Sequence, residues 1–73
     1  MQITYDPEVD ALYVRFVDES IEVTTHRLTE DVAVDYAPDG RVVGLEVLDA
    51  SEHVFGTDVE KRVTLHNLKP IVA

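Results

Sequence analysis

The chain has 73 residues, the length of one small domain with a thin hydrophobic core. It carries 15 aspartates and glutamates against 6 lysines and arginines, a formal net charge of −9, which disfavours nucleic acids and anionic membranes as partners. Cysteine is absent, which excludes disulfides, thiolate metal sites and cysteine nucleophiles. Because a domain of this size commonly needs further support, we expect a homo-oligomer, and the acidic charge favours a basic protein as an additional partner.

The N-terminal sequence has no cationic stretch followed by an apolar one, so no signal peptide is indicated. No apolar run approaches the roughly 20 residues that a membrane-spanning helix needs. We therefore expect a cytoplasmic protein. Residues 1–73 are expected to form a single domain, with a β-sheet region over 1–48 and a short helix and C-terminal tail over 49–73.

Five short strands are predicted in the first two-thirds of the chain. Apolar and polar residues alternate along 11–17, where Leu12 and Val14 share one face and Tyr13 and Arg15 the other, as in a half-buried strand. The same reasoning predicts strands at 3–5, 21–28, 32–36 and 41–48, and the polar breaks at 18–20 and 29–31 have the length of hairpin turns. The expected fold is mainly β (small α+β), an antiparallel β-meander of about five short strands with a short helix after residue 48.

The sequence Ala-Pro-Asp-Gly at 37–40 is the strongest turn signal in the chain. Proline has a preset φ, and Gly40 can adopt the left-handed conformation that many turns require. A four-residue loop here would pair Val34 with Val43 and keep apolar residues opposite one another. We expect that register.

The strand predicted at 41–48 has two unequal faces. One is apolar and is expected to point into the core: Val43, Leu45 and Val47. The other is less polar than a fully solvated face and consists of Val42, Gly44, Glu46 and Leu48. Whether this second face is covered stays open at the level of sequence.

A helix start is expected directly after Leu48. Asp49 or Ser51 can serve as the N-cap, and Glu52 is placed to complete a capping box with Asp49. Gly56 is expected to end the helix after one or two turns. The tail has no clean period, and we expect a second short helix over about 57–63 followed by an extended end.

Asp35 and Glu46 are the candidate functional carboxylates, because they lie on neighbouring predicted strands and face away from the core. A carboxylate pair performs acid–base chemistry only where burial or a close like charge separates the two pKa values. Arg15 and Arg41 are the available cations, and salt bridges with them are the plainest role. These four residues form a candidate functional surface, and no catalytic, cofactor-binding or metal-binding residue is assigned.

Metal binding is the alternative. The loop acids Asp6, Glu8 and Asp10 lack the central glycine and closing glutamate of a calcium loop, so a solvated turn is favoured. The histidines, at positions 26, 53 and 66, match no zinc spacing, although they could converge at a subunit interface. The three glycines do not form a phosphate-binding loop, and neither serine lies in a nucleophile elbow.

Two stretches resemble a known family, the prokaryotic proteins catalogued as domain of unknown function 2283. The residues that carry the resemblance are Tyr5-Asp6-Pro7, Asp10-Ala11-Leu12-Tyr13, Val34-Asp35-Tyr36, Asp39-Gly40-Arg41, Gly44, Glu46 and Leu48-Asp49-Ala50-Ser51. The resemblance covers roughly residues 3 to 53 and implies a compact antiparallel β-meander with a short helical segment, with no established activity or catalytic residue to transfer. It also suggests an antitoxin-like or accessory role beside a small toxin-like protein, and the acidic charge of this chain fits a basic partner.

The sequence favours a non-enzymatic, self-associating protein-interaction module that needs no cofactor. A metal- or small-ligand-binding domain with its site at a subunit interface is the alternative.

Overall fold

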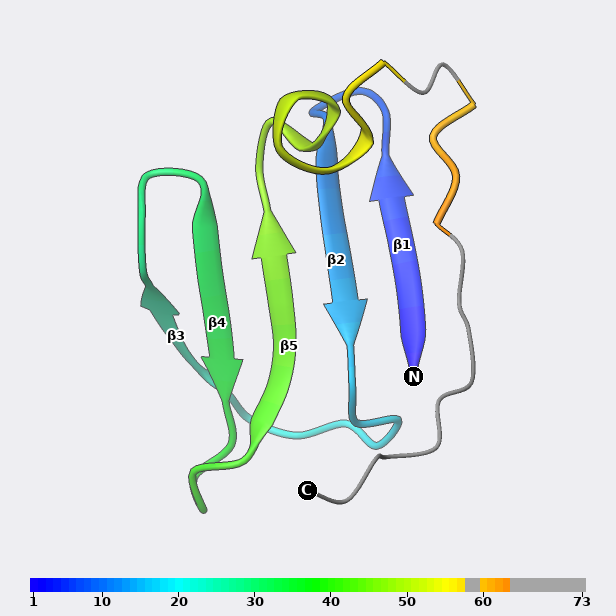
Figure 1. Cartoon of the computed structure of the whole chain (residues 1–73). Helices are drawn as coiled ribbons and strands as arrows, with labels where there is room; N and C mark the ends of the chain where they lie inside the picture. The colour runs from blue at the N-terminus through cyan, green and yellow to red at the C-terminus, as the bar shows by residue number, and fades with distance from the viewer. Residues whose placement is uncertain (58–59, 64–73) are drawn as a thin grey trace, which may run out of the picture.

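The protein forms one five-stranded antiparallel sheet, seen in a computed structural model that describes residues 1–57 and 60–63 (Figure 1). The strands are β1 Gln2–Asp6, β2 Ala11–Arg15, β3 Thr24–Arg27, β4 Val32–Tyr36 and β5 Val42–Val47. The prediction of a small, mainly β antiparallel fold is confirmed. In the described part of the chain, no helix is long and apolar enough to cross a membrane.

The strands are arranged in the order β1-β2-β5-β4-β3. The β1–β2 hairpin and the up-and-down unit β3-β4-β5 each keep chain neighbours together, and the two units meet where β2 pairs with β5. The predicted hairpin at 18–20 is therefore wrong. The β2–β5 pairing sets apolar residues opposite one another, Leu12 with Val47 and Val14 with Leu45, which β3 could not do. As a result β3 lies at the far edge of the sheet.

The β4–β5 hairpin turns at Gly40, whose φ is 91° and whose N–H donates to the Ala37 carbonyl oxygen. Val34 lies opposite Leu45 rather than Val43, so the predicted register is wrong by two residues. An irregularity between Asp35 and Tyr36 accommodates the shift. Because the shift over 32–35 is an even number of residues, the side chains there keep their predicted faces, whereas beyond the irregularity Tyr36 lies opposite Val42, a shift of one residue.

The hydrophobic core lies on one face of the sheet, at the end where β5 leads into the helical turn (Figure 1). Phe55 is the large side chain of that turn, and its ring meets the Tyr5 ring edge-on at a centroid distance of 5.2 Å. The cluster consists of buried Leu12, Val47, Ala50 and Phe55 with partly buried Ile3, Tyr5 and Leu45. A single short turn thus covers the apolar ends of β1, β2 and β5.

The helical turn is a single π-helical turn, Ser51–Phe55, which ends at Gly56 as predicted. The predicted cap is wrong: Ala50 occupies the N-cap position and no side chain of the turn caps it. Asp49 is instead left-handed, with φ 50°, and its carbonyl oxygen accepts the N–H groups of Glu52 and His53. Residues 60–63 are not helical, and the rest of the predicted tail helix and extended end, 58–59 and 64–73, lies outside the described residues.

Candidate functional site

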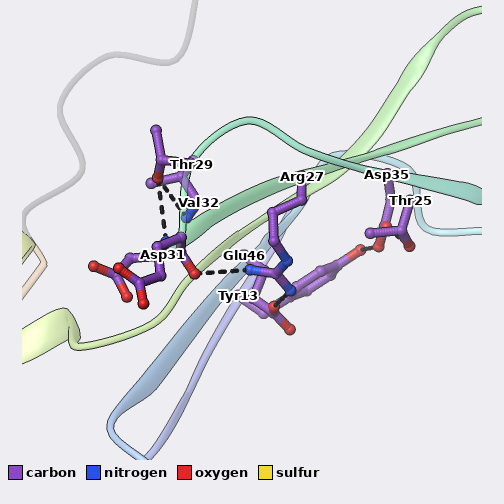
Figure 2. A network of polar contacts seen from close by, with 9 residues as sticks. Tyr13, Thr25, Arg27, Thr29, Asp31, Val32, Asp35 and Glu46 are labelled. Carbon is purple, nitrogen blue, oxygen red and sulfur yellow. Dashed lines mark hydrogen bonds and ion pairs between the residues drawn. The ribbon is translucent and has the colours of Figure 1, made fainter.

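A polar network covers the sheet face opposite the core. It links four neighbouring strands, and Figure 2 shows its members side by side. The network consists of Tyr13, Thr25, Arg27, Asp35 and Glu46, and we call the face that carries it the network face. Two small residues lie beneath these side chains, Ala33 and Gly44, and both are buried.

Gly44 allows Tyr13 to reach across a whole strand. Tyr13 on β2 lies opposite Glu46 of β5, and Gly44 is the next β5 residue on the same face, opposite Asp35 of β4. A Cβ atom at position 44 would overlap the Tyr13 ring and hydroxyl. The phenol therefore lies over β5, and its hydroxyl donates to Asp35 Oδ2 at 2.7 Å. The other oxygen, Oδ1, accepts the Thr25 hydroxyl from β3 at 2.5 Å.

The Arg27 side chain extends over a strand in the opposite direction, from β3 toward β5. It lies on β3 opposite Ala33 of β4, which in turn lies opposite Glu46 of β5. The short Ala33 side chain lets the guanidinium pass over β4 to Glu46 Oε1, at 3.5 Å (Figure 2). The same guanidinium donates to the Glu30 carbonyl oxygen at 3.2 Å. Each of these two long side chains thus crosses one strand, in opposite directions, over a small residue.

The electrostatics of the network favour a structural role, holding the strands together, over a role in acid–base catalysis. Burial raises the pKa of Tyr13 to about 12, and its hydrogen bond to the Asp35 carboxylate contributes in the same direction. The phenol therefore stays protonated and donates at neutral pH, which removes it as an acid–base group there. Asp35 has both oxygens occupied by hydroxyl donors.

Three of the four candidate residues share the network face, because Arg15 lies opposite Gly44 and Gly44 lies opposite Asp35. Asp35 and Glu46 both lie on the network face, each with its own partner. Arg15 instead donates to the Glu19 carbonyl oxygen at 2.6 Å, and Arg41 pairs with Asp39 at 2.8 Å. The expected salt bridges of Arg15 and Arg41 to the two acids are wrong, because both arginines are drawn to groups in the nearest loops.

A second cluster joins the first hairpin to the helical turn. The Asp10 carboxylate, in the β1–β2 loop, accepts the Tyr5 hydroxyl at 2.6 Å. It also accepts the Ser51 hydroxyl at 2.9 Å and the Ser51 backbone N–H at 3.1 Å, across 41 residues of sequence. The Ala50 N–H donates to the Asp10 carbonyl oxygen at 3.0 Å. Asp10 therefore provides from a distant loop the cap that Asp49 was expected to provide locally.

These bonds shift the titration of both partners. The hydrogen bond from Tyr5 is the largest effect and lowers the pKa of Asp10; burial opposes it, and the two hydrogen bonds from Ser51 lower the pKa further. The same bond to the Asp10 carboxylate, with burial, raises the pKa of Tyr5. Both shifts favour the charged carboxylate beside the neutral phenol, so the cluster is intact at neutral pH.

The sequence was compared with known protein families, curated proteins and solved structures. A family described as "Protein of unknown function (DUF2283)" matches residues 2–51, about two-thirds of the chain. The chain belongs to the DUF2283 family. The match covers all five strands and ends at Ser51, so it spans both the network and the Asp10 cluster. No curated protein and no solved structure matches the chain.

The metal candidates of this DUF2283 chain are separated by the fold. Asp6 accepts the N–H of Glu8 within its own loop, and Asp10 is occupied as described above. His53 pairs with Asp31 at 3.0 Å, which raises the pKa of His53. Among the described residues, no three histidine, aspartate or glutamate side chains converge to hold a metal ion. The prediction for His66 lies outside the described residues.

Sequence reasoning missed Tyr13, Thr25 and Arg27, the network's non-acidic members. In this DUF2283 sheet their partners follow from the register, which alternation alone does not give. One signal was present: Gly44 lies inside the predicted strand, and a glycine inside a strand often marks a place where another group approaches the backbone closely. The second face of β5 is covered in part: Gly44 is buried under Tyr13, while Val42 is 43% exposed.

Proposed function

We propose that this protein is a non-enzymatic protein-interaction module that binds another polypeptide by adding a strand to the open edge of β3. The observation that carries the proposal is β3 itself. It forms one edge of the sheet, and all four of its side chains are exposed. Edge strands present unpaired backbone groups that template pairing with another chain.

The direction of the backbone groups on β3 follows from the ladder. The Leu28 N–H donates to the Val32 carbonyl oxygen at 2.8 Å, which places Leu28 at a hydrogen-bonded position toward β4. In an antiparallel pair such positions alternate. His26 and Thr24 therefore also bond toward β4, and the backbone N–H and C=O groups of Thr25 and Arg27 point away from the sheet.

The same two residues anchor β3 by their side chains. Thr25 is bonded to Asp35 and Arg27 to Glu46, both on the network face. The edge is thus held in a strand conformation before any partner arrives. Ordering it in advance lowers the entropy cost of adding a strand.

A basic protein partner is the second candidate, and the charge distribution favours it. Strands β1, β3 and β5 run in the same direction, so the segments that follow them meet at one end of the sheet (Figure 1). That acidic end carries the exposed residues Asp6, Glu8, Glu30, Asp49 and Glu52, with Lys61 over the Phe55 ring as a nearby cation. At the opposite end Arg41 pairs with Asp39 and the N-terminal amine with Asp18. The concentrated charge supports steering of a basic partner, in line with an accessory or antitoxin-like role.

A pull-down from the native lysate with matched variants tests the edge proposal. Thr25→Pro removes the outward N–H but no hydrogen bond between β3 and β4, whereas Thr25→Val keeps the N–H and loses only the side-chain bond. A stoichiometric partner retained by Thr25→Val and lost by Thr25→Pro supports the proposal. A partner retained equally by both folded variants contradicts strand addition.

Amide hydrogen exchange on the wild-type protein gives a readout that needs no variant. In dilute isolated protein, the N–H groups of Thr25 and Arg27 should exchange faster than those of Thr24 and His26. Addition of the captured partner should slow Thr25 and Arg27 selectively. Unchanged exchange at both positions in the saturated complex would contradict the proposal.

The basic partner is tested by charge. Its binding should weaken with rising salt and with Glu8→Lys or Glu52→Lys at the acidic end. Glu19→Lys at the opposite end is the control, since the Glu19 pair with Arg41 is long, 3.9 Å, and exposed. Equal loss with all three variants would mean that only net charge matters and that the acidic end has no special part.

A further inference from the structure

We infer that the strand added to β3 is the β3 strand of a second copy, so that two sheets join into one continuous ten-stranded sheet about a two-fold axis at Thr25. This inference rests on the proposed function and names its partner. Its first support is a difference between sequence and structure. The alternating pattern predicts a strand over 21–28, yet β3 spans only Thr24–Arg27.

The reason lies in the neighbouring strand. β4 ends at Tyr36, which is the partner of Thr24, and Ala37 already belongs to the turn. Val23 and the residues before it therefore have no β4 residue to pair with. A strand pattern without a partner among the described residues fits a partner from a second chain.

The second support is charge. The chain has a net charge of −9, so two copies repel one another over most surfaces. Residues 23–29, Val-Thr-Thr-His-Arg-Leu-Thr, contain no acid and carry the cation Arg27. The other edge strand, β1, ends in Asp6 and is followed closely by Glu8. The β3 edge is thus the sheet edge where a second copy meets the least repulsion, and a basic peptide gains little there.

The third support is the register that the outward groups allow. In an antiparallel two-fold pairing, outward residues must oppose outward residues, which limits the choices. Placing Thr25 on the axis opposes Thr25 with its own copy and Val23 with Arg27 in both halves. This arrangement uses the outward groups of all three residues. Moving the axis to His26 would oppose Glu22 with Glu30, a like-charge pair that destabilises pairing.

Exposed apolar side chains are also covered in this register. Val23 is 37% exposed and would lie beside the aliphatic part of Arg27 of the second copy. Leu28 is 56% exposed and would lie opposite the stem of Glu22. On the face that Glu22 shares with His26, the two residues become diagonal neighbours across the joint, an opposite-charge contact when the imidazole is protonated.

Two substitutions at one exposed site test the partner and the register together. Val23→Lys places a lysine opposite Arg27 twice in the dimer, whereas Val23→Glu places a glutamate there. Bulk repulsion predicts the reverse order, because lysine reduces the negative charge of each copy and glutamate increases it. Sedimentation velocity over a concentration series should show a wild-type dimer, a dimerisation constant weakened about tenfold by Val23→Lys, and no weakening by Val23→Glu.

A cysteine probe checks the axis independently, since the chain has no cysteine of its own. Thr25→Cys should form a covalent dimer on mild oxidation or with a short thiol cross-linker. Thr4→Cys on β1 is the control and should form far less. Equal cross-linking at both sites would overturn the β3 joint.

The outcomes separate this inference from the proposed function. A wild-type protein that stays monomeric at high concentration, or a dimer weakened more by Val23→Glu than by Val23→Lys, overturns the inference. If a different protein is still captured and lost with Thr25→Pro, the edge function stands without the dimer. If neither dimer nor edge-dependent partner is found, both fail.

Discussion

The hydroxyl of Tyr13 reaches Asp35 across an intervening strand, at 2.7 Å, because the residue beneath its ring is Gly44. Three residues from β2, β4 and β5 thus act as one unit, and Thr25 extends it to β3 through the second oxygen of Asp35. In a sheet with a thin core on one face, such a unit ties strands together on the other. It also fixes the edge strand whose open side we propose as the interaction surface.

Gly44→Ala should destabilise the protein by about 2 kcal/mol, because the new Cβ displaces the Tyr13 ring and breaks its bond to Asp35. Urea unfolding gives the free energy of unfolding. In a Tyr13→Ala background the same substitution should cost little, since the three atoms nearest to the new Cβ, Tyr13 Oη, Cζ and Cε1, are all removed. An equal cost in both backgrounds would show that the glycine serves the backbone instead.

Arg27 and Glu46 should contribute much less than the Tyr13–Asp35 bond. Their ion pair is 3.5 Å long, and the side chains are 48% and 39% exposed. A double-mutant cycle with Arg27→Gln and Glu46→Gln should give a coupling energy of at most about 0.5 kcal/mol, falling with added salt. A coupling that is large and independent of salt would mean that the pair is shielded from solvent in solution, as a partner on this face would cause.

The sequence predicted the strands well because each of β1, β2, β4 and β5 has an apolar face of its own, and burial imposes the period of two. It did not predict that β2 pairs with β5, because polar breaks at 18–20 and 29–31 look alike locally while only the second closes a hairpin. The register erred by two residues because Val43 and Leu45 are both acceptable partners for Val34. Local patterns of this kind predict on which face of a strand each side chain lies, but they do not predict which strands pair or in which register.

The sites were harder to predict for the same reason. The hydrogen bond between Ser51 and Asp10 joins residues 41 positions apart, so no local sequence pattern could predict it. The local pattern predicted a capping box of Asp49 and Glu52 instead. Asp35 and Glu46 were identified from their face, but their partners required knowing that β3 follows β4 at the edge. The contacts of Tyr13 and Arg27 could be predicted only by recognising that the small residues Gly44 and Ala33 leave room for long side chains on the network face.

Asp10 should make the protein sensitive to acid. Its pKa is lowered from the ordinary value of 3.8 in the folded protein, so its contribution to stability is complete above 3.8 and is lost as pH falls through the lower folded value. Asp10→Asn should be less stable at neutral pH and should lose less stability on acidification. Urea midpoints measured from pH 5 downward, with Asp6→Asn from the same loop as control, give the comparison. Parallel curves for wild type and Asp10→Asn would contradict a lowered pKa.

His53 should produce the opposite dependence on pH. Its hydrogen bond and attraction to Asp31 raise its pKa above the ordinary 6.5, so the folded state binds the proton more tightly than the unfolded state. The resulting stability is complete below 6.5 and is lost as pH rises through the folded pKa. The pair links the helical turn to the β3–β4 loop, where Asp31 also accepts the Leu48 N–H through its backbone oxygen at 2.8 Å.

Asp31→Asn is the informative variant for this pair, because it removes the charge and leaves that backbone bond in place. It should return the pKa of His53 toward 6.5 in an NMR titration and should flatten the loss of stability as pH rises above 6.5. A His53 titration that does not move in Asp31→Asn would place the cause of the raised pKa in Glu52 and Asp49 instead, the nearby acids of the helical turn.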